Sequence, residues 1–295
     1  MINLLVTHQL GELNGNVADP RNVHEWEGLV MTAPALVLLA SGSDDPRVAQ
    51  VIHALRKQIQ IQRPELSVNL AFLDHCPPTG PQVVSALANR GLDEIVFVPM
   101  DLCSAIETTD QVNSMVDKVK ATYPNLRISV SRPIGPSVDL LTLLDQKLRN
   151  SLTARHCLEL DALVFCVPGS GDIRGNALLS RRARQWAAHH KLPVNIAYCD
   201  GSGTSVTAAI QNHRSQGRRA IAVGSFFLTG DEAFLRQAEQ ATLAGAVAVS
   251  SPFGADQHIA DLVFSRYAYG AMDLLDQSEA SAFDDAEYLA IAAFN

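Results

Sequence analysis

The sequence predicts an α/β protein built from two tandem domains, each a parallel sheet flanked by helices. The first observation is a repeat: residues 34–47 and residues 161–174 both run from a short apolar segment into Gly-Ser, then Asp, then Arg. The second is the length of these apolar segments, which are too short for a helix and typical of buried parallel strands. The third is the helix-like stretch that follows each of them, so the repeated unit is a strand, a turn and a helix.

Composition limits the class of protein. The chain has 295 residues, of which 47% are apolar, enough for two domains with a substantial core. Its formal net charge of −8 argues against a nucleic-acid partner, which would need clustered Lys and Arg. No apolar run is long enough for a membrane span. Cysteines without CxxC spacing indicate reduced thiols, and we therefore expect a cytoplasmic protein with no nucleic-acid and no membrane partner.

The first copy is expected to alternate strands and helices. Consecutive prolines in residues 75–81 exclude a helix interior there and indicate a loop. The predicted strands are residues 35–40, 68–74, 94–99 and 126–133, and the predicted helices are about 46–61, about 82–90 and one that ends near Tyr123.

The second copy repeats this order, with residues 194–200 matching 68–74, residues 218–224 matching the third strand, and residues 246–254 matching 128–135. The tail is acidic and alanine-rich, and is either a terminal helix or a disordered end. The domains we assign are an N-terminal extension (1–33), domain 1 (34–150), domain 2 (151–272) and a C-terminal tail (273–295).

A ligand site is expected where the strands end. Right-handed crossovers place the carboxyl ends of parallel strands at one edge of a sheet, and open α/β sheets bind ligands there. The turns at that edge should line two clefts or one shared cleft; they are residues 41–47, 74–80 and 101–110, with 168–174, 200–204 and 225–232.

These landmarks resemble the sirohydrochlorin chelatase family, class II tetrapyrrole chelatases that insert Co2+ or Fe2+ into the sirohydrochlorin ring. The resemblance covers roughly residues 34–268, in two copies, as in the long two-domain members. It rests on the turn Gly42-Ser43-Asp-Asp-Pro46-Arg47, the strand end Ala71-Phe-Leu-Asp74, the strand Val96-Phe-Val-Pro99, and Pro252-Phe-Gly254. It implies two chelatase-like domains, a lyase of ferro- or cobaltochelatase type in siroheme or cobalamin biosynthesis, Fe2+ or Co2+ as substrate metal, and no permanently bound cofactor.

The chain departs from this family at the usual histidines. Family members usually carry one His before the Gly-Ser turn and another after the Val-Pro strand, and these bind the metal and accept pyrrole protons. Here the first position holds Ser41 and Pro168 in the two copies, and the second holds Glu107 and, roughly, Glu232. A carboxylate suits Co2+ or Fe2+ less well than imidazole does, but it can serve as a base or a ligand.

The first copy is the better candidate for the active site, because the second has Pro168 where a polar group would be needed. The resemblance and the cleft edge point to catalytic roles for Ser41, His75 and Glu107. Metal binding is assigned to His75, Glu107 and Glu232. Substrate binding is assigned to residues of the turns and strand ends, namely Gly42, Ser43, Asp74, Gly169, Ser170 and Asp200.

Each candidate also has a structural explanation. His75 can be solvated in its proline-rich loop, Glu107 can belong to a helix N-terminus, and the two aspartates can cap the turns that follow them. The Gly-Ser turns can hold substrate carboxylates through backbone N–H groups, or can be tight turns only. Arg47 and Arg174 can assist with carboxylates, or can pair with Asp45 and Asp172. We expect no site at His189 and His190, which lie too near a helix end.

The sequence therefore predicts a protein that binds a cyclic tetrapyrrole, as a monomer whose two domains are related by a pseudo-two-fold axis. Two functions remain open. One is metal insertion without ATP, with the second copy completing the cleft. The other is a non-catalytic protein that binds a metal or a tetrapyrrole on the same fold.

Overall fold

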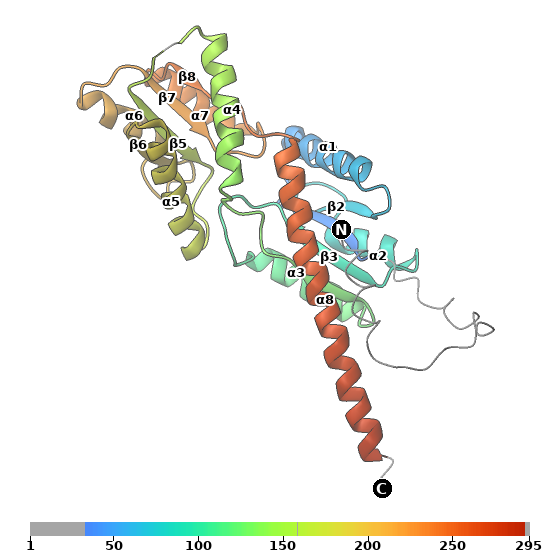
Figure 1. Ribbon diagram of the computed structural model, residues 1–295. Coiled ribbons are helices and arrows are strands. Elements are labelled where there is room, and N and C mark those ends of the chain that lie inside the picture. Colours follow the sequence, from blue (N-terminus) through green and yellow to red (C-terminus); the bar gives the residue numbers. More distant parts are fainter. Residues whose placement is uncertain (1–32, 158, 293–295) are drawn as a thin grey trace, which may run out of the picture. The chain divides into compact units, whose positions relative to one another are not determined.

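The computed structural model describes residues 33–157 and 159–292, with side chains as far as residue 276, so the predicted extension lies outside the described residues apart from Ala33. Two four-stranded sheets, both parallel throughout, have the same strand order, β2-β1-β3-β4 and β6-β5-β7-β8 (Figure 1). The predicted α/β fold with two helix-flanked parallel sheets is thus confirmed.

The first sheet comprises β1 (Ala35–Ala40), β2 (Val68–Phe72), β3 (Glu94–Pro99) and β4 (Arg127–Val130), and its chain segment also forms α1 (Pro46–Gln62), α2 (Gly80–Ala88), α3 (Asp110–Thr122) and α4 (Asp139–Ala154). The second comprises β5 (Ala162–Val167), β6 (Val194–Tyr198), β7 (Ile221–Ser225) and β8 (Ala248–Val249), with α5 (Ile173–His190), α6 (Val206–Ser215), α7 (Glu232–Leu243) and α8 (Gln257–Ala292).

The central strand of each sheet is buried on both faces. In β1, Leu36 and Leu38 face one hydrophobic cluster while Val37 and Leu39 face another, because successive side chains in a strand point to opposite sides. The same alternation in β5 divides its side chains between two clusters. One of these clusters is shared, since it contains Leu36 of β1 together with Phe165 of β5. The two sheets are therefore joined through a common core.

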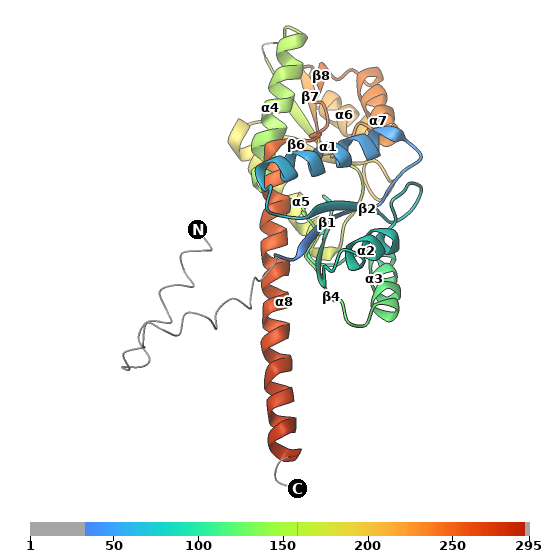
Figure 2. The same ribbon diagram turned by 90° about the vertical axis from the view of Figure 1, so that its right-hand side faces the viewer.

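The last helix of each repeat packs on the sheet of the other. Helix α4 follows β4 in the chain but contacts β7 and β8, whereas α8 follows β8 and contacts β3 and β4 (Figures 1 and 2). Close approach makes both contacts specific. A Cβ added to Gly270 of α8 would lie 2.6 Å from Val96 Cγ1 on β3. Tyr267 on the same helix donates its hydroxyl to the Pro34 carbonyl at 2.7 Å, which ties α8 to the start of β1.

Several element ends differ from the sequence prediction. Strand β2 ends at Phe72 rather than residue 74, and β4 is confined to residues 127–130. The last strand was expected over 246–254 and is only Ala248–Val249, since Pro252 lacks the N–H that a longer ladder would need. The tail, left open between a helix and a disordered end, continues α8 as far as Ala292.

Gly270→Val should lower the free energy of unfolding by about 1–3 kcal/mol, because the new side chain would overlap Val96 and push α8 away from β3. Urea unfolding measures the effect. Ser265→Val, which places the same side chain at an exposed position of the same helix, is the control and should have little effect. Equal stability of the two variants would contradict this packing.

Candidate functional site

The carboxyl ends of the two sheets meet at a shared cavity of about 310 Å³. The first repeat contributes Ser41, Gly42 and Ser43 from the turn after β1, and Asp101 from the loop after β3. The second repeat contributes Pro168 from the turn after β5, with Leu228, Thr229 and Asp231 from the loop after β7. Of the six predicted turns, those after β1, β3, β5 and β7 contribute to this one cleft, whereas the turns after β2 and β6 do not line it.

A smaller cavity of about 50 Å³ lies at the same edge of the first sheet. Ser41 and Asp101 line it as well as the shared cleft, and Glu107 and Thr108 line its other side. Two of the three predicted catalytic residues, Ser41 and Glu107, are therefore brought together although they are far apart in the sequence. This cavity has oxygen ligands on one side and the apolar side chains of Leu39 and Val112 on the other.

The turn after β1 requires glycine at its second position. Gly42 has φ +84°, and a Cβ there would lie 2.1 Å from the carbonyl oxygen of Asp74. The Asp74 N–H donates to the Ser41 carbonyl at 3.2 Å, so the ends of β1 and β2 are held in contact. Asp74 Oδ1 is buried with no hydrogen-bond partner among the residues described. The close turn thus fixes Ser41 at the rim of the cleft.

His75 lies to one side of the cleft, between two carboxylates. Its Nδ1 is 3.4 Å from Asp44 Oδ1, and its Nε2 is 3.6 Å from Asp74 Oδ2. Its backbone has φ +59°, an uncommon conformation for a side chain other than glycine. His75 is half exposed and does not line the cavity that contains Ser41 and Glu107. The structure therefore groups it with Asp44 and Asp74.

Glu107 is positioned by a carboxylate of the other repeat. Asp172, the N-cap of α5, accepts hydrogen bonds at Oδ2 from the backbone N–H groups of Ala105 (3.1 Å), Ile106 (2.8 Å) and Glu107 (2.8 Å). Its Oδ1 accepts from the Gly175 N–H. Burial alone would raise the pKa of the Asp172 carboxyl, but these N–H groups outweigh it and hold the pKa below its ordinary value of 3.8. The Asp172 carboxylate thus fixes the loop that carries Glu107.

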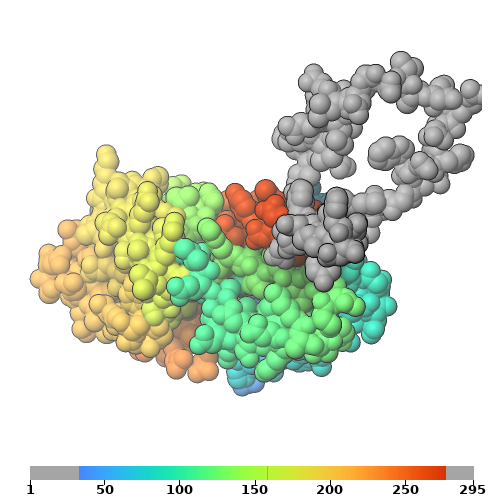
Figure 3. All heavy atoms as spheres, turned by 90° about the horizontal axis from the view of Figure 1, so that it is seen from below, coloured from blue at the N-terminus to red at the C-terminus, as the bar shows by residue number. Residues whose placement is uncertain are grey.

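Beside this contact, the backbones of the two repeats pack so closely that side chains would not fit between them. A Cβ added to Gly171 or Gly175 would lie 2.0 or 2.1 Å from the Cys103 carbonyl oxygen. In the space-filling view, green and teal atoms of the first repeat adjoin yellow atoms of the second along a continuous surface (Figure 3). Burial raises the pKa of the neighbouring Cys103 thiol to about 12, so that it stays protonated at neutral pH.

Asp45, which caps the first helix of the first repeat as Asp172 caps that of the second, pairs mainly within its own repeat. Asp45 caps α1 and binds the Arg47 guanidinium at 2.6–3.1 Å, which lowers the pKa of its carboxyl; the Glu232 backbone N–H contributes in the same direction. Arg47 therefore pairs with Asp45, one of the two roles left open for it.

In the second repeat the polar groups of the turns form hydrogen bonds with one another. Asp200 accepts hydrogen bonds from the Ser170 N–H at 3.0 Å and from the Ser202 N–H at 2.9 Å. A Cβ at Gly169 would lie 2.6 Å from Asp200 Oδ2. For Asp200 the geometry supports the turn-capping role, and the Ser170 N–H already donates to a carboxylate of the protein.

Sequence reasoning missed several residues that the structure brings to important positions. Asp101 lines both cavities and accepts from the Cys103 N–H at 2.7 Å; its place at the end of a parallel strand could have identified it. His189 and His190, at which no site was expected, both approach Asp145 of α4. That aspartate is distant in sequence, and no local pattern connects it to the histidines.

Comparison with known proteins finds a match for the first repeat: residues 35–151 match the model of the CbiX family. Two curated relatives agree with it: a sirohydrochlorin cobaltochelatase of Methanopyrus kandleri is 29% identical over 82 residues (28% of this chain and 57% of the relative), and one of Priestia megaterium is 21% identical over 163 residues (55% and 53%). The predicted relationship to sirohydrochlorin chelatases is confirmed. The match spans little more than half the length of each curated relative.

Solved structures of CbiX and related chelatases share the fold. SirB from Bacillus subtilis with Fe3+ has a TM-score of 0.66 and 17% identity, with 83% of this chain and 98% of that chain covered. CbiX, described as the terminal enzyme of siroheme biosynthesis in denitrifying bacteria, has a TM-score of 0.53 and 16% identity, with 79% and 98% covered. These likenesses extend the chelatase fold across both repeats. Among the described residues, no helix has the length and apolar character needed to cross a membrane.

Asp172→Asn should lower the free energy of unfolding by about 1–3 kcal/mol near neutral pH, because three loop N–H groups lose a charged acceptor. A depressed folded-state pKa gives stability that is present above the ordinary pKa of 3.8 and is lost as the pH falls through the folded value. The difference from the wild type should therefore shrink below pH 3.8, as measured by urea unfolding across pH.

Asp117→Asn removes one charge at an exposed position and serves as the matched control for Asp172→Asn. Its effect should be small at every pH. If Asp172→Asn lowers the free energy of unfolding by the same amount in acid as at neutral pH, the Asp172 carboxylate does not stabilise the loop.

Proposed function

We propose that this CbiX relative is a sirohydrochlorin chelatase, a lyase that inserts Fe2+ or Co2+ into the ring without ATP. The observation that carries the proposal is the convergence of Ser41, Asp101 and Glu107 on one small cavity beside the shared cleft. The curated relatives from Methanopyrus and Priestia, described as sirohydrochlorin cobaltochelatases, support the same reaction class.

The reaction exchanges two pyrrole protons for one divalent ion. The protein must therefore hold the ring, accept protons and present the metal on weak ligands. We propose that the Glu107 carboxylate accepts a pyrrole proton, and that the Ser41 hydroxyl and the Asp101 carboxylate bind the ion briefly before the ring nitrogens replace them. Oxygen ligands bind these borderline metals less strongly than imidazoles do, which favours transfer to the ring over retention.

His75 and Glu232 are proposed as metal ligands along the approach to the ring. His75 is exposed between Asp44 and Asp74, so a cation would meet one imidazole and two carboxylates there. Glu232 is exposed beside the Asp45–Arg47 pair on the opposite side of the cleft. Both residues lie outside the small Ser41–Glu107 cavity, which agrees with a role before, rather than during, insertion.

The ring is proposed to bind across the mouth of the shared cleft. Its volume of about 310 Å³ is at the lower end of the roughly 300–1,000 Å³ range of small-molecule sites, so a tetrapyrrole would enter by one edge only. The Gly42-Ser43 turn is the better candidate for holding ring carboxylates, because the Ser170 N–H already donates to Asp200. Gly169 and Asp200 would then shape the turn rather than contact the ring.

A single chain supplies both sides of this cleft, and we therefore propose that the protein acts as a cytoplasmic monomer with pseudo-two-fold domains. The boundaries at residues 33, 150 and 272 remain part of this proposal. The chain would need no permanently bound cofactor, since the divalent ion is the substrate.

Glu107→Gln tests the proposed base. The amide cannot accept a proton at neutral pH, so cobalt or iron insertion into sirohydrochlorin should slow by at least about tenfold, with the ring still bound. Anaerobic absorbance spectroscopy, with a control lacking protein, follows the metallated ring. His75→Ala should reduce the rate at low metal concentration more than at saturation, since it is assigned to metal approach. Glu239→Gln, an exposed substitution on α7, is the control.

The alternative is a non-catalytic protein that binds a tetrapyrrole or a metal, and the replacement of the usual histidines in both copies favours it. A spectral change on ring binding, without faster metallation than the control, would establish this alternative. No spectral change with the ring would exclude both chelatase activity and tetrapyrrole binding.

A further inference from the structure

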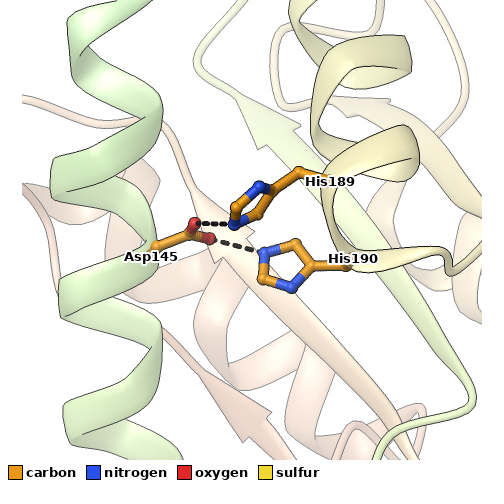
Figure 4. Close-up of side chains that lie close together, drawn as sticks. All are labelled: Asp145, His189 and His190. Atoms are coloured by element: carbon orange, nitrogen blue, oxygen red, sulfur yellow. Dashed lines mark hydrogen bonds and ion pairs between the residues drawn. The ribbon is translucent and has the colours of Figure 1, made fainter.

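A second group of potential metal ligands lies outside the cleft, between two helices. Asp145 is on α4, and His189 and His190 form the last turn of α5 (Figure 4). His190 Nε2 is 2.8 Å from Asp145 Oδ1, and His189 Nε2 is 3.7 Å from Asp145 Oδ2. The two helices come from different parts of the chain, so this convergence is a product of the fold.

The separations of the three side chains fit a single ion. One ligand atom from each residue lies within 4.8 Å of the others. Ligands at about 2.0–2.2 Å from a tetrahedral ion are roughly 3.3–3.6 Å apart. The two imidazoles approach the carboxylate at comparable distances, 2.8 Å to Oδ1 and 3.7 Å to Oδ2. Two imidazoles and one carboxylate form a ligand set suited to Zn2+, Co2+, Ni2+ or Fe2+.

The carboxylate is held in place by residues behind it. Trp186 Nε1 donates to Asp145 Oδ1 at 2.6 Å, and the Trp186 ring is almost fully buried against the edge of the His190 ring. The Asp145 side chain is only 14% exposed. A supporting donor of this kind orients a metal-binding carboxylate and leaves Oδ2 directed toward His189.

Access from solvent is open on the other side. His189 is 65% exposed and borders a surface cavity of about 590 Å³ that also contains Asp145, Gln146 and Gln185. An ion bound there would have room for water at a remaining position. Arg149 lines the same cavity and is a cationic neighbour of the site.

We propose that Asp145, His189 and His190 bind one divalent transition-metal ion that links α4 to α5. Helix α4 follows the first sheet in the chain but packs on the second, so the ion would clamp this exchanged helix to the repeat on which it packs. The site is separate from the Ser41–Glu107 cavity and does not depend on chelatase activity.

The test uses untagged full-length protein, freed of metal and titrated with Co2+ under anaerobic conditions without tetrapyrrole. Metal content after dialysis gives the stoichiometry, and visible absorption of Co2+ reports nitrogen ligation. Variants are His189→Gln, the double variant His189→Gln with His190→Gln, Glu107→Gln to remove the proposed base of the cleft, and His258→Gln as a histidine control outside both sites.

Wild type, Glu107→Gln and His258→Gln should each retain the absorption of a nitrogen-ligated ion and gain thermal stability on adding Co2+. His189→Gln should bind this ion at least about tenfold more weakly, and the double variant should lose it together with the thermal gain. His189 is largely exposed, so its single variant should fold normally.

Co2+ binding and a thermal gain in the double variant equal to those of wild type would overturn the proposal, as would a wild-type protein that takes up no nitrogen-ligated Co2+. Because the Glu107→Gln protein is tested without the ring, failure of this site and failure of the proposed chelatase activity give separate results.

Discussion

The cleft depends on one set of contacts. The Asp172 carboxylate accepts hydrogen bonds from three consecutive N–H groups of a loop in the first repeat. Residues 105–107 have no helix or strand of their own to satisfy these donors, and a carboxylate is a strong acceptor for them. The same carboxylate caps α5, so one side chain fixes both the start of a helix in the second repeat and the path of a loop in the first. Glu107 therefore has a defined position only when both repeats are folded and in contact.

The exchange of α4 and α8 gives this contact its rigid support. Each sheet is covered on one side by a helix from the other half of the chain, and the shared core contains residues of both. Neither repeat could bury its full apolar surface by itself, because one covering helix would be missing. Relative movement of the two sides of the cleft must thus disturb the Gly270–Val96 packing or the Asp172 cap, and a wide opening is disfavoured. This restraint agrees with a ring that enters the cleft by one edge.

The sequence was sufficient for the repeat, the parallel strands and the edge at which a site would form, since these follow from short apolar runs and from the turn residues after them. It could not indicate the helix exchange. The buried stripe of α4, made of Leu140, Leu143, Leu144 and Leu148, shows that the helix packs on something but not on which sheet. For the same reason Asp145 could not be connected with His189 and His190. The sequence also did not predict the role of Asp172, because the residues around it suggested only a pair with Arg174.

The two repeats have nearly the same backbone but different side chains at the cleft, and this asymmetry favours the first repeat as the proposed site. Ser41 and Pro168 occupy equivalent turns and line the same cleft, yet only the serine offers a hydroxyl. In the first repeat Asp74 Oδ1 has no hydrogen-bond partner among the described residues, whereas the equivalent Asp200 is occupied with Ser170 and Ser202. A buried, unpaired carboxylate oxygen is costly unless it has a ligand to meet. This difference supports the proposal that the reactive groups lie in the first repeat.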